Sequence, residues 1–202
     1  MRYVIAVCIG YLLGCSNMAL YLARRKNVDL KSGGSGNLGA SNATAMLGWV
    51  SGALVAIHDI GKSALAVYLA MKLFPRLEYV GAMAGIASVL GHVFPFYLKF
   101  RGGKGFASYL GMTLVLNWKL ALFIFVVGIL ITVISDYIVL ATTATVLTVP
   151  AYLGWSGGSL QLGIILAIGS AVIIYKHRMN YVRICNGTEI GLRSVAQGKH
   201  RV

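Results

Sequence analysis

The sequence predicts an all-α, polytopic membrane protein with seven transmembrane helices, and three observations lead to that class. Of the 202 residues, 58% are hydrophobic and only 11% are charged, whereas about a quarter of the residues of a soluble domain are charged. The apolar residues form runs of the length that a bilayer span needs, about 20 residues. The basic residues lie between these runs. We therefore exclude a disordered chain, a disulfide scaffold and a soluble enzyme, and expect residues 1–202 to form a single membrane-embedded domain without internal repeats.

The spans follow from the apolar runs in order along the chain. The first run carries no charge, and the second includes His58, Asp59 and Lys62. The run that begins at Gly105 would make a helix of about 46 Å, too long for one upright span, so we expect a turn at 117–119. The predicted helices are Tyr3–Ala23, Ala43–Met71, Tyr79–Leu98, Gly105–Trp118, the stretch from that turn to Ser135, Tyr137–Trp155 and Leu160–Tyr175.

Two local features are expected along these spans. Ser41 or Asn42 should cap the second helix, because both residue types favour that position. The fourth helix would reach only about 21 Å. Either the bilayer thins there or the preceding loop dips below the headgroups, and we favour the dip. Such backbone is tolerated where it is buried in protein or lines a wet cavity.

The positive charge is distributed unevenly. The formal net charge is +13, from 18 Lys and Arg against 5 Asp and Glu. Because the cations flank apolar runs, we expect anionic headgroups or a phosphorylated substrate, and no nucleic acid. Seven spans put the termini on opposite sides, and the positive-inside rule places the N-terminus outside and the C-terminus in the cytoplasm. The cations assigned to the cytoplasmic side are Arg24, Arg25, Lys26, Lys31, Lys99, Arg101, Lys104, Lys176, Arg178, Arg183, Arg193, Lys199 and Arg201.

The cysteines indicate neither a disulfide framework nor a metal site. Cys8 and Cys15 lie in the first apolar run and Cys185 lies in the basic C-terminal segment, with no CxxC pattern. We expect no metal and no cofactor.

The first of three glycine-rich polar segments is Gly33–Asn42. Gly34, Gly36 and Gly39 satisfy GxGxxG, but no βαβ unit can follow inside a membrane helix, so this is not a dinucleotide fingerprint. Glycine backbone N–H groups can nevertheless converge on an anion at the start of the next helix. We interpret the segment as a phosphate cradle; the alternative is a flexible turn.

The other two segments also combine glycine, amide and cationic groups. Gly102–Gly105 surrounds Lys104, and glycine follows that lysine, so it is not a Walker A loop; the alternative is a basic loop on anionic lipid. His92, near the end of the third helix, is a site residue or a packing residue. If the last helix continues, Lys176, Asn180 and Arg183 share one face with His177 beside them. The alternative there is a basic cap that snorkels to the interface.

Charged side chains also occur inside the second predicted helix. Asp59 and Lys62 are three positions apart, and His58 is four from Lys62. A charge within a span costs about 2.5–3.5 kcal/mol on insertion scales, so such residues usually face the bundle interior and pair. A structural ion pair and a direct role in the site both remain open.

Together, the three segments resemble the motifs of the bacterial acyl-phosphate-dependent glycerol-3-phosphate acyltransferases, the PlsY type. The resemblance spans most of the chain, and its motifs are specific in combination although each is weak alone. Asp59 and Lys62 also match a family pattern. The three motifs are Gly34-Ser35-Gly36-Asn37-x-Gly39-Ala40-x-Asn42, Gly91-His92-x-x-Pro95 running to Lys104-Gly105, and His177-x-x-Asn180-x-x-Arg183 through Gly187 and Glu189.

The resemblance implies transfer of a fatty acyl group from acyl phosphate to the 1-hydroxyl of sn-glycerol 3-phosphate, giving lysophosphatidic acid and phosphate. It implies a bacterial inner-membrane protein of seven helices with a cytoplasmic site. Independently of the resemblance, we expect contact with membrane lipid and a protein that can act as a monomer, although the sequence does not give the oligomeric state. One departure concerns Ala45, where many members have arginine. If that arginine contacts a substrate phosphate, another cation must replace it or binding is weaker.

Both implied substrates carry phosphate, so the site must hold two anionic groups close together. The candidate residues at the reacting groups are His92, Lys104, Ser35 and Asn37. Asp59 and Glu189 are candidate supporting residues. The candidate phosphate-binding residues are Ser35, Gly36, Asn37, Gly39, Asn42, Gly102, Gly103, Lys104, Gly105, Lys62, His177, Asn180 and Arg183.

No nucleophilic triad can be identified from the sequence. No His is followed by Asp five positions later, and no GxSxG occurs. We therefore expect direct attack by the glycerol hydroxyl on the donor, with the donor's phosphate or His92 as base. A small transporter of an anionic solute is the competing class; it would favour a midplane site and often a repeat.

Overall fold

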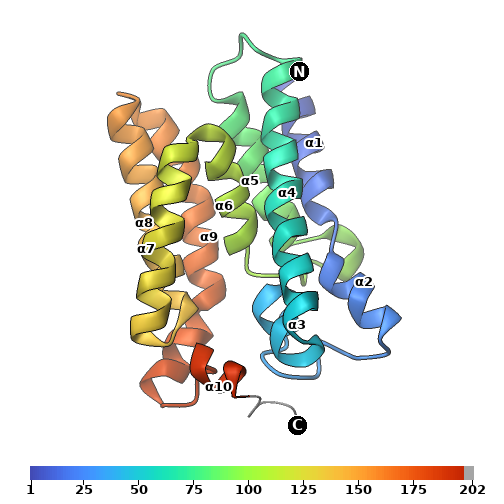
Figure 1. Ribbon diagram of the computed structural model, residues 1–202. Coiled ribbons are helices and arrows are strands. Elements are labelled where there is room, and N and C mark those ends of the chain that lie inside the picture. The colour runs from blue at the N-terminus through green and yellow to red at the C-terminus, as the bar shows by residue number, and fades with distance from the viewer. Residues whose placement is uncertain (198–202) are drawn as a thin grey trace.

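The computed structural model describes residues 1–197, so Lys199 and Arg201, assigned above to the cytoplasmic side, lie outside the described residues. Within this range every regular element is a helix, which confirms the all-α class. Figure 1 shows the order of the elements. They are α1 (Arg2–Cys15), α2 (Met18–Arg25), α3 (Ala40–Leu47), α4 (Trp49–Leu73), α5 (Val80–Val93), the 3-10 turn η1 (Phe96–Leu98), α6 (Phe106–Leu116), α7 (Trp118–Ser135), α8 (Ile138–Ser156), α9 (Leu160–Cys185) and α10 (Leu192–Ala196).

The predicted number of full spans is too high by one. Six helical segments of the described chain are long and apolar enough to cross a membrane, and the predicted fourth helix is the short α6. At 11 residues it extends about 16 Å. The turn after it is confirmed: Asn117 caps α7, accepting a hydrogen bond from the N–H of Leu120 at 2.9 Å. The bundle therefore has one half-length helix in its interior.

The first apolar run is not one continuous helix. It breaks at 16–17, and Asn17 caps α2 by accepting from the N–H of Leu20 at 2.8 Å. The break frees two carbonyls at the end of α1. Tyr97 donates to the carbonyl of Cys15 at 2.7 Å, and Lys62 donates to that of Ser16 at 2.6 Å. Side chains from distant helices thus satisfy the backbone where the helix is interrupted, as an apolar environment requires.

The second run is also divided. Gly48 has φ of +91° and separates α3 from α4, a conformation that favours glycine. The residue before α3 is Gly39, without a side-chain cap, so the prediction that Ser41 or Asn42 caps a helix is wrong. The reason is that the amide of Asn42 bonds instead to the loop before α3, accepting from the N–H of Ser35 at 2.8 Å.

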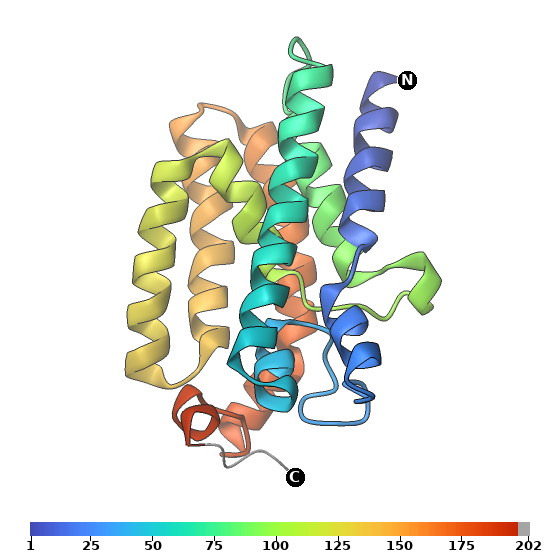
Figure 2. The ribbon, with the colours of Figure 1, turned by 45° about the vertical axis from the view of Figure 1, so that its right-hand side comes forward.

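The third run ends earlier than predicted, at Val93, because Pro95 cannot continue a helix. The chain then turns through η1 and returns beside the end of α5. The N–H of Gly102 donates to the carbonyl of Val93 at 3.0 Å, and the N–H of Gly103 donates to the carbonyl of His92 at 3.1 Å. Figure 2 shows this green segment at mid-height, with α4 and α9 continuing below it. This geometry fits the expected dip; its depth relative to headgroups stays a prediction.

The helices pack in two groups with α6 between them. In Figure 1, α7, α8 and α9 lie on one side, and α1, α4 and α5 lie on the other. Gly10 and Gly14 let α1 approach the backbone of α5 so closely that a Cβ at either position would overlap it. The main core cluster includes Val67, Tyr109 and Leu166 from α4, α6 and α9. The short α6 is therefore enclosed by the two groups.

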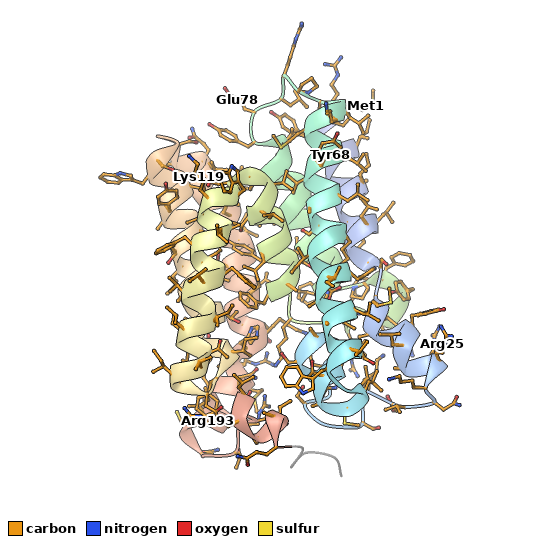
Figure 3. The ribbon with its side chains drawn as sticks, in the orientation of Figure 1. Met1, Arg25, Tyr68, Glu78, Lys119 and Arg193 are labelled. Atoms are coloured by element: carbon orange, nitrogen blue, oxygen red, sulfur yellow. The ribbon has the colours of Figure 1, made fainter. Side chains whose placement is uncertain are left out.

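Charged residues separate toward the two ends of the bundle. Figure 3 places Arg25 and Arg193 at one end, and Met1, Glu78 and Lys119 at the other. The glycine-rich loop before α3 and the far end of α9 lie at the same end as Arg25. The last long helix continues to Cys185, beyond its predicted end at Tyr175. The basic segments are thus collected in one half of the molecule, opposite the N-terminus.

Candidate active site

The second and third glycine-rich segments meet at Lys104. Its ammonium donates to the amide oxygen of Asn180 at 2.6 Å. The Nδ2 of Asn180 donates to Glu189 at 2.5 Å, and the Nε of Arg183 donates to the other oxygen of Glu189 at 2.6 Å. The predicted helical face is therefore real, because α9 carries Asn180 and Arg183 beneath the lysine. Three charged groups and one amide form a continuous chain of hydrogen bonds, the Lys104–Glu189 chain.

Lys104 lies in a loop that removes it partly from water, and this changes its acidity. Burial, followed by the nearby Arg183, lowers the pKa of its ammonium to about 8, while Glu189 acts in the opposite direction. Burial and the neighbouring positive charge both disfavour the charged form of the lysine. A bound anion opposes both effects, so this ammonium gains more from an anionic partner than a solvated one would. Phosphate is an anion of the required kind.

A second charged cluster lies inside the bundle, on α4 and α5. The ammonium of Lys62 contacts Asp59 at 2.8 Å and the Nδ1 of His92 at 2.9 Å. Asp59 also lies 3.4 Å from the same imidazole nitrogen. All three side chains are almost completely buried. The predicted intramembrane pair is thus confirmed as an ion pair, and the structure adds His92 to it.

The imidazole of His92 connects this cluster to the loop that carries Lys104. The backbone carbonyl of His92 accepts a hydrogen bond from the N–H of Gly103, and a Cβ at Gly103 would overlap the imidazole ring at Nε2. Only glycine fits at this position, because the loop backbone rests directly on the ring. One ring nitrogen is thus hydrogen-bonded to Lys62 while the opposite edge packs against the loop. The ion pair therefore fixes the glycine loop through His92.

The first segment forms a compact loop around Asn42. The amide nitrogen of this buried residue donates to the carbonyl of Leu30 at 2.9 Å and to that of Gly33 at 3.3 Å. Asn42 therefore shapes the loop from inside, whereas Ser35 and Gly36 are exposed. Packing joins this segment to the second one, since Leu38 and Leu98 belong to one hydrophobic cluster. The segment lies at the basic end of the bundle, with Gly39 buried at the start of α3.

His177 and Lys176 complete the third segment. The Nδ1 of His177 lies 2.8 Å from the carbonyl of Ile173 one turn earlier, and its side chain is buried. This contact fixes the ring orientation. The ammonium of Lys176 lies 5.5 Å from the centre of the Phe94 ring, a cation–π distance. The third segment therefore packs onto the end of α5 as well as onto Lys104.

The structure also brings together residues that sequence reasoning missed. The Oγ of Ser16 lies 2.8 Å from the Nε2 of His58, and the Nδ1 of that histidine lies 3.3 Å from Asp59. Ser16 and His58 are separated by 42 positions, so no spacing rule connects them. The signal that could have located the helix break is the polar pair Ser16 and Asn17 inside the first apolar run, since asparagine favours the helix N-cap.

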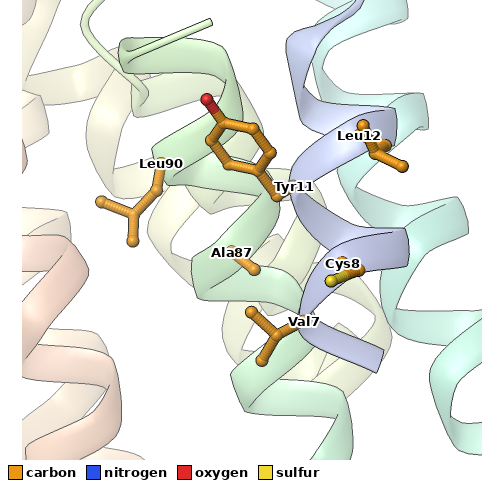
Figure 4. A pocket seen from close by; sticks show the side chains of 6 residues that line it. All are labelled: Val7, Cys8, Tyr11, Leu12, Ala87 and Leu90. Carbon is orange, nitrogen blue, oxygen red and sulfur yellow. The ribbon is translucent and has the colours of Figure 1, made fainter. Parts of the chain in front are cut away.

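An apolar hollow of about 290 Å³ lies between α1 and α5 (Figure 4). The phenol of Tyr11, on its wall, donates to the carbonyl of Phe94 at 2.7 Å, two residues beyond His92. The hollow therefore opens beside the end of α5. Its lining residues are Val7, Cys8, Tyr11, Leu12, Ala87 and Leu90.

The chain is similar to known proteins over almost its whole length. A family model described as glycerol-3-phosphate acyltransferase matches residues 4–187. A protein named glycerol-3-phosphate acyltransferase from Aquifex aeolicus strain VF5 is 35% identical over 189 residues, which cover 94% of this chain and 98% of the relative. Glycerol-3-phosphate acyltransferase 1 from Oceanobacillus iheyensis is 34% identical over 203 residues, or 96% and 97% of the two chains.

Two crystal structures have the same fold. Both are described as PlsY (YgiH), an integral membrane glycerol 3-phosphate acyltransferase, and both share 34% sequence identity with this chain. The glycerol 3-phosphate form has a TM-score of 0.90, with 98% of each chain covered. The lysophosphatidic acid form has a TM-score of 0.86, covering 98% of this chain and all of the other. The chain belongs to the glycerol-3-phosphate acyltransferase family.

Proposed function

We propose that the protein transfers a fatty acyl group from acyl phosphate to the 1-hydroxyl of sn-glycerol 3-phosphate. The products are lysophosphatidic acid and phosphate. The observation that carries this proposal is the contact between Lys104 and Asn180, which unites a glycine-rich loop and a basic helix face in one anion-binding site. Family membership supports the acyltransferase chemistry, and the similarity to PlsY in its glycerol 3-phosphate form supports the acceptor.

In this proposal the cationic and amide groups divide between two phosphate groups. Lys104, His177 and Asn180 bind the glycerol 3-phosphate end, because they lie together on the loop and on α9. Arg183 and Glu189 hold Asn180 in place. The first loop and the backbone around Lys104 contribute further N–H donors. The remaining proposed site residues are Ser35, Gly36, Asn37, Gly39, Asn42, Gly102, Gly103, Gly105, Lys62, Asp59 and His92.

The proposed chemistry is a direct attack of the glycerol hydroxyl on the acyl carbonyl, with phosphate as the leaving group. Alignment of the two substrates and neutralisation of their charge then supply most of the rate. The donor's own phosphate accepts the hydroxyl proton. The environment of His92 supports this choice over the histidine, because its Nδ1 is hydrogen-bonded to Lys62 and its ring packs against Gly103. A His92→Ala variant that folds but loses nearly all kcat would instead favour the histidine as base.

The acyl chain in this proposal reaches the site laterally from lipid. The hollow beside Tyr11 is apolar and adjoins the end of α5, so we assign the chain to it. The whole chain then works as one domain, as a monomer, in a bacterial inner membrane. The concentration of cations at one end supports a cytoplasmic position for that end, and for the C-terminus and the site with it.

The deciding experiment uses purified protein reconstituted in lipid. Palmitoyl phosphate is compared with palmitoyl-CoA and with a palmitoyl thioester of acyl carrier protein. Lysophosphatidic acid is measured with and without glycerol 3-phosphate, together with phosphate release from the acyl phosphate and thiol release from the thioesters. Release from palmitoyl phosphate that requires glycerol 3-phosphate and forms lysophosphatidic acid is the expected result. Transfer from the thioesters alone would contradict the proposed donor.

The same preparation tests the transporter alternative. Labelled glycerol 3-phosphate or phosphate is placed outside sealed vesicles, and uptake is measured without an acyl donor. An enzyme takes up no label and forms lysophosphatidic acid once palmitoyl phosphate is added, whereas a transporter accumulates label and forms no lipid product after that addition. Uptake without acyl transfer would overturn the proposed function.

A further inference from the structure

Outside the Lys104–Glu189 chain, three residues form a second array with catalytic geometry. The hydroxyl of Ser16 is hydrogen-bonded to the Nε2 of His58 at 2.8 Å, and the Nδ1 of His58 lies 3.3 Å from the carboxylate of Asp59. A nucleophile within hydrogen-bond reach of a base, with the base oriented by a third group, is the arrangement that activates a serine hydroxyl. The array is formed by the break between α1 and α2 and one face of α4.

The groups around this array fix it in place. The carboxylate of Asp59 is buried and also bound by Lys62 at 2.8 Å, so it cannot turn away from His58 without breaking an ion pair. The same ammonium donates to the backbone carbonyl of Ser16 at 2.6 Å. One lysine thereby holds both ends of the array and brings positive charge to the serine.

The helix that follows supplies a second source of positive potential. α2 begins at Met18, two residues after Ser16. The first N–H groups of a helix have no intrahelical acceptor, and the helix dipole adds to their attraction for negative charge. The N–H of Leu20 is taken by Asn17, which leaves those of the preceding residues for an oxyanion. Charge that develops on an acyl oxygen near Ser16 would be stabilised there.

The array is accessible, unlike the imidazole of His92. Ser16 is exposed, and the side chain of His58 retains 21% of its exposure against 3% for His92. The surrounding face of α4 is apolar, because Leu54 and Ile57 are both exposed. A Cβ at Gly61, one turn after His58, would meet nothing within 4 Å. The array therefore opens beside a lipid-facing surface that suits a long acyl chain.

We propose that Ser16, His58 and Asp59 form a serine-nucleophile site that hydrolyses activated fatty acyl esters, an activity beyond the proposed acyl transfer. The Oγ of Ser16 attacks the acyl carbonyl carbon while its proton passes to the Nε2 of His58. The bond to the leaving group breaks, and the leaving group takes up that proton, leaving a Ser16 ester. Water then attacks this ester and gives a proton to His58. The fatty acid leaves, and the proton on His58 returns to the Ser16 oxygen.

The first test is covalent labelling of the full chain in lipid nanodiscs. A long-chain alkyl fluorophosphonate should modify Ser16, with loss of fluoride, and peptide mass spectrometry should locate the adduct. Ser32→Ala is the matched control, since Ser32 is an exposed serine whose hydroxyl donates only to a backbone carbonyl. It should leave labelling unchanged. Absence of an adduct, or an adduct on another serine, overturns the proposal.

The second test is hydrolysis of p-nitrophenyl palmitate without glycerol 3-phosphate, so that its outcome does not depend on acyl transfer. Ser16→Ala and His58→Gln should each lower the rate at least about 100-fold, the usual contribution of a nucleophile or its base. Ser16→Ala should keep acyl transfer to glycerol 3-phosphate, which shows that it is folded. If this variant does not fold, Ser16→Cys serves instead and should lose fluorophosphonate labelling. Hydrolysis that persists in Ser16→Ala overturns the proposal.

Discussion

The Lys104→Ala substitution tests the proposed phosphate site most directly. It removes the ammonium that meets Asn180 and leaves the rest of the Lys104–Glu189 chain in place. Because Lys104 is half-buried, an effective dielectric constant of about 20 applies. A unit charge at about 4 Å from one phosphate charge then contributes about 4 kcal/mol. That energy corresponds to about a 10³-fold loss of kcat/KM for glycerol 3-phosphate.

The assay is phosphate release from palmitoyl phosphate at varied glycerol 3-phosphate. Lys99→Ala is the matched control, because Lys99 is an exposed cation of the same segment and should change kcat/KM by less than about fivefold. Lys104→Arg should retain part of the activity, since it keeps the charge but changes the geometry. A loss of less than about fivefold in folded Lys104→Ala, or an equal loss in Lys99→Ala, refutes the assignment.

The remaining predictions concern the pKa of Lys104, the packing of Gly103, the positioning role of Glu189 and the length of the acyl chain. The pKa of Lys104 in the folded protein is about 8, below that of an ordinary lysine. As the pH rises through 8 the ammonium loses its charge, so kcat/KM should fall, which a pH–rate profile measures. The free energy of unfolding should rise over the same range because the neutral amine is easier to bury, and urea titrations at several pH values measure that. Gly103→Ala should lower the free energy of unfolding by about 1–3 kcal/mol through overlap with a ring, while Gly61→Ala, which meets open space, should not. Glu189→Gln should raise KM for glycerol 3-phosphate more than it lowers kcat, because the residue holds Asn180 rather than the reacting atoms; steady-state kinetics separates the two. Cys8→Trp should shift activity toward shorter acyl phosphates by narrowing the hollow, and a chain-length series checks this.

The parts of the fold that local chemistry determines were predictable from the sequence. The turn before α7 follows from helix length and from the capping ability of Asn117. The interruption after Cys15 was missed although the polar pair Ser16 and Asn17 stands there and Asn17 can cap a helix. The groups that satisfy the freed carbonyls, Tyr97 and Lys62, come from distant segments, which no local pattern shows. The division at Gly48 was missed because glycine is also common at close helix contacts.

In the candidate site, too, local patterns were predictable from the sequence and contacts between distant segments were not. The shared face of α9 could be predicted, because residues four apart in a helix are neighbours. The contact between Lys104 and Asn180 depends on how two separate segments pack, so the motifs suggested it but could not give its geometry. Asn42 is a predicted phosphate-binding residue, but its amide forms hydrogen bonds within its own loop. The contact of Ser16 with His58 lacked any signal, since the histidine comes from another helix.

The interruption after α1 has a consequence for biogenesis. During synthesis the first apolar segment enters the bilayer before Lys62 and Tyr97 exist, so at that stage nothing can satisfy the carbonyls of Cys15 and Ser16. Exposed carbonyls are costly in hydrocarbon, which favours an unbroken helix in the newly inserted chain. The bend then has to arise after α4 and the segment that carries Tyr97 have been inserted, so the N-terminal region reaches its final shape later than the first helix itself.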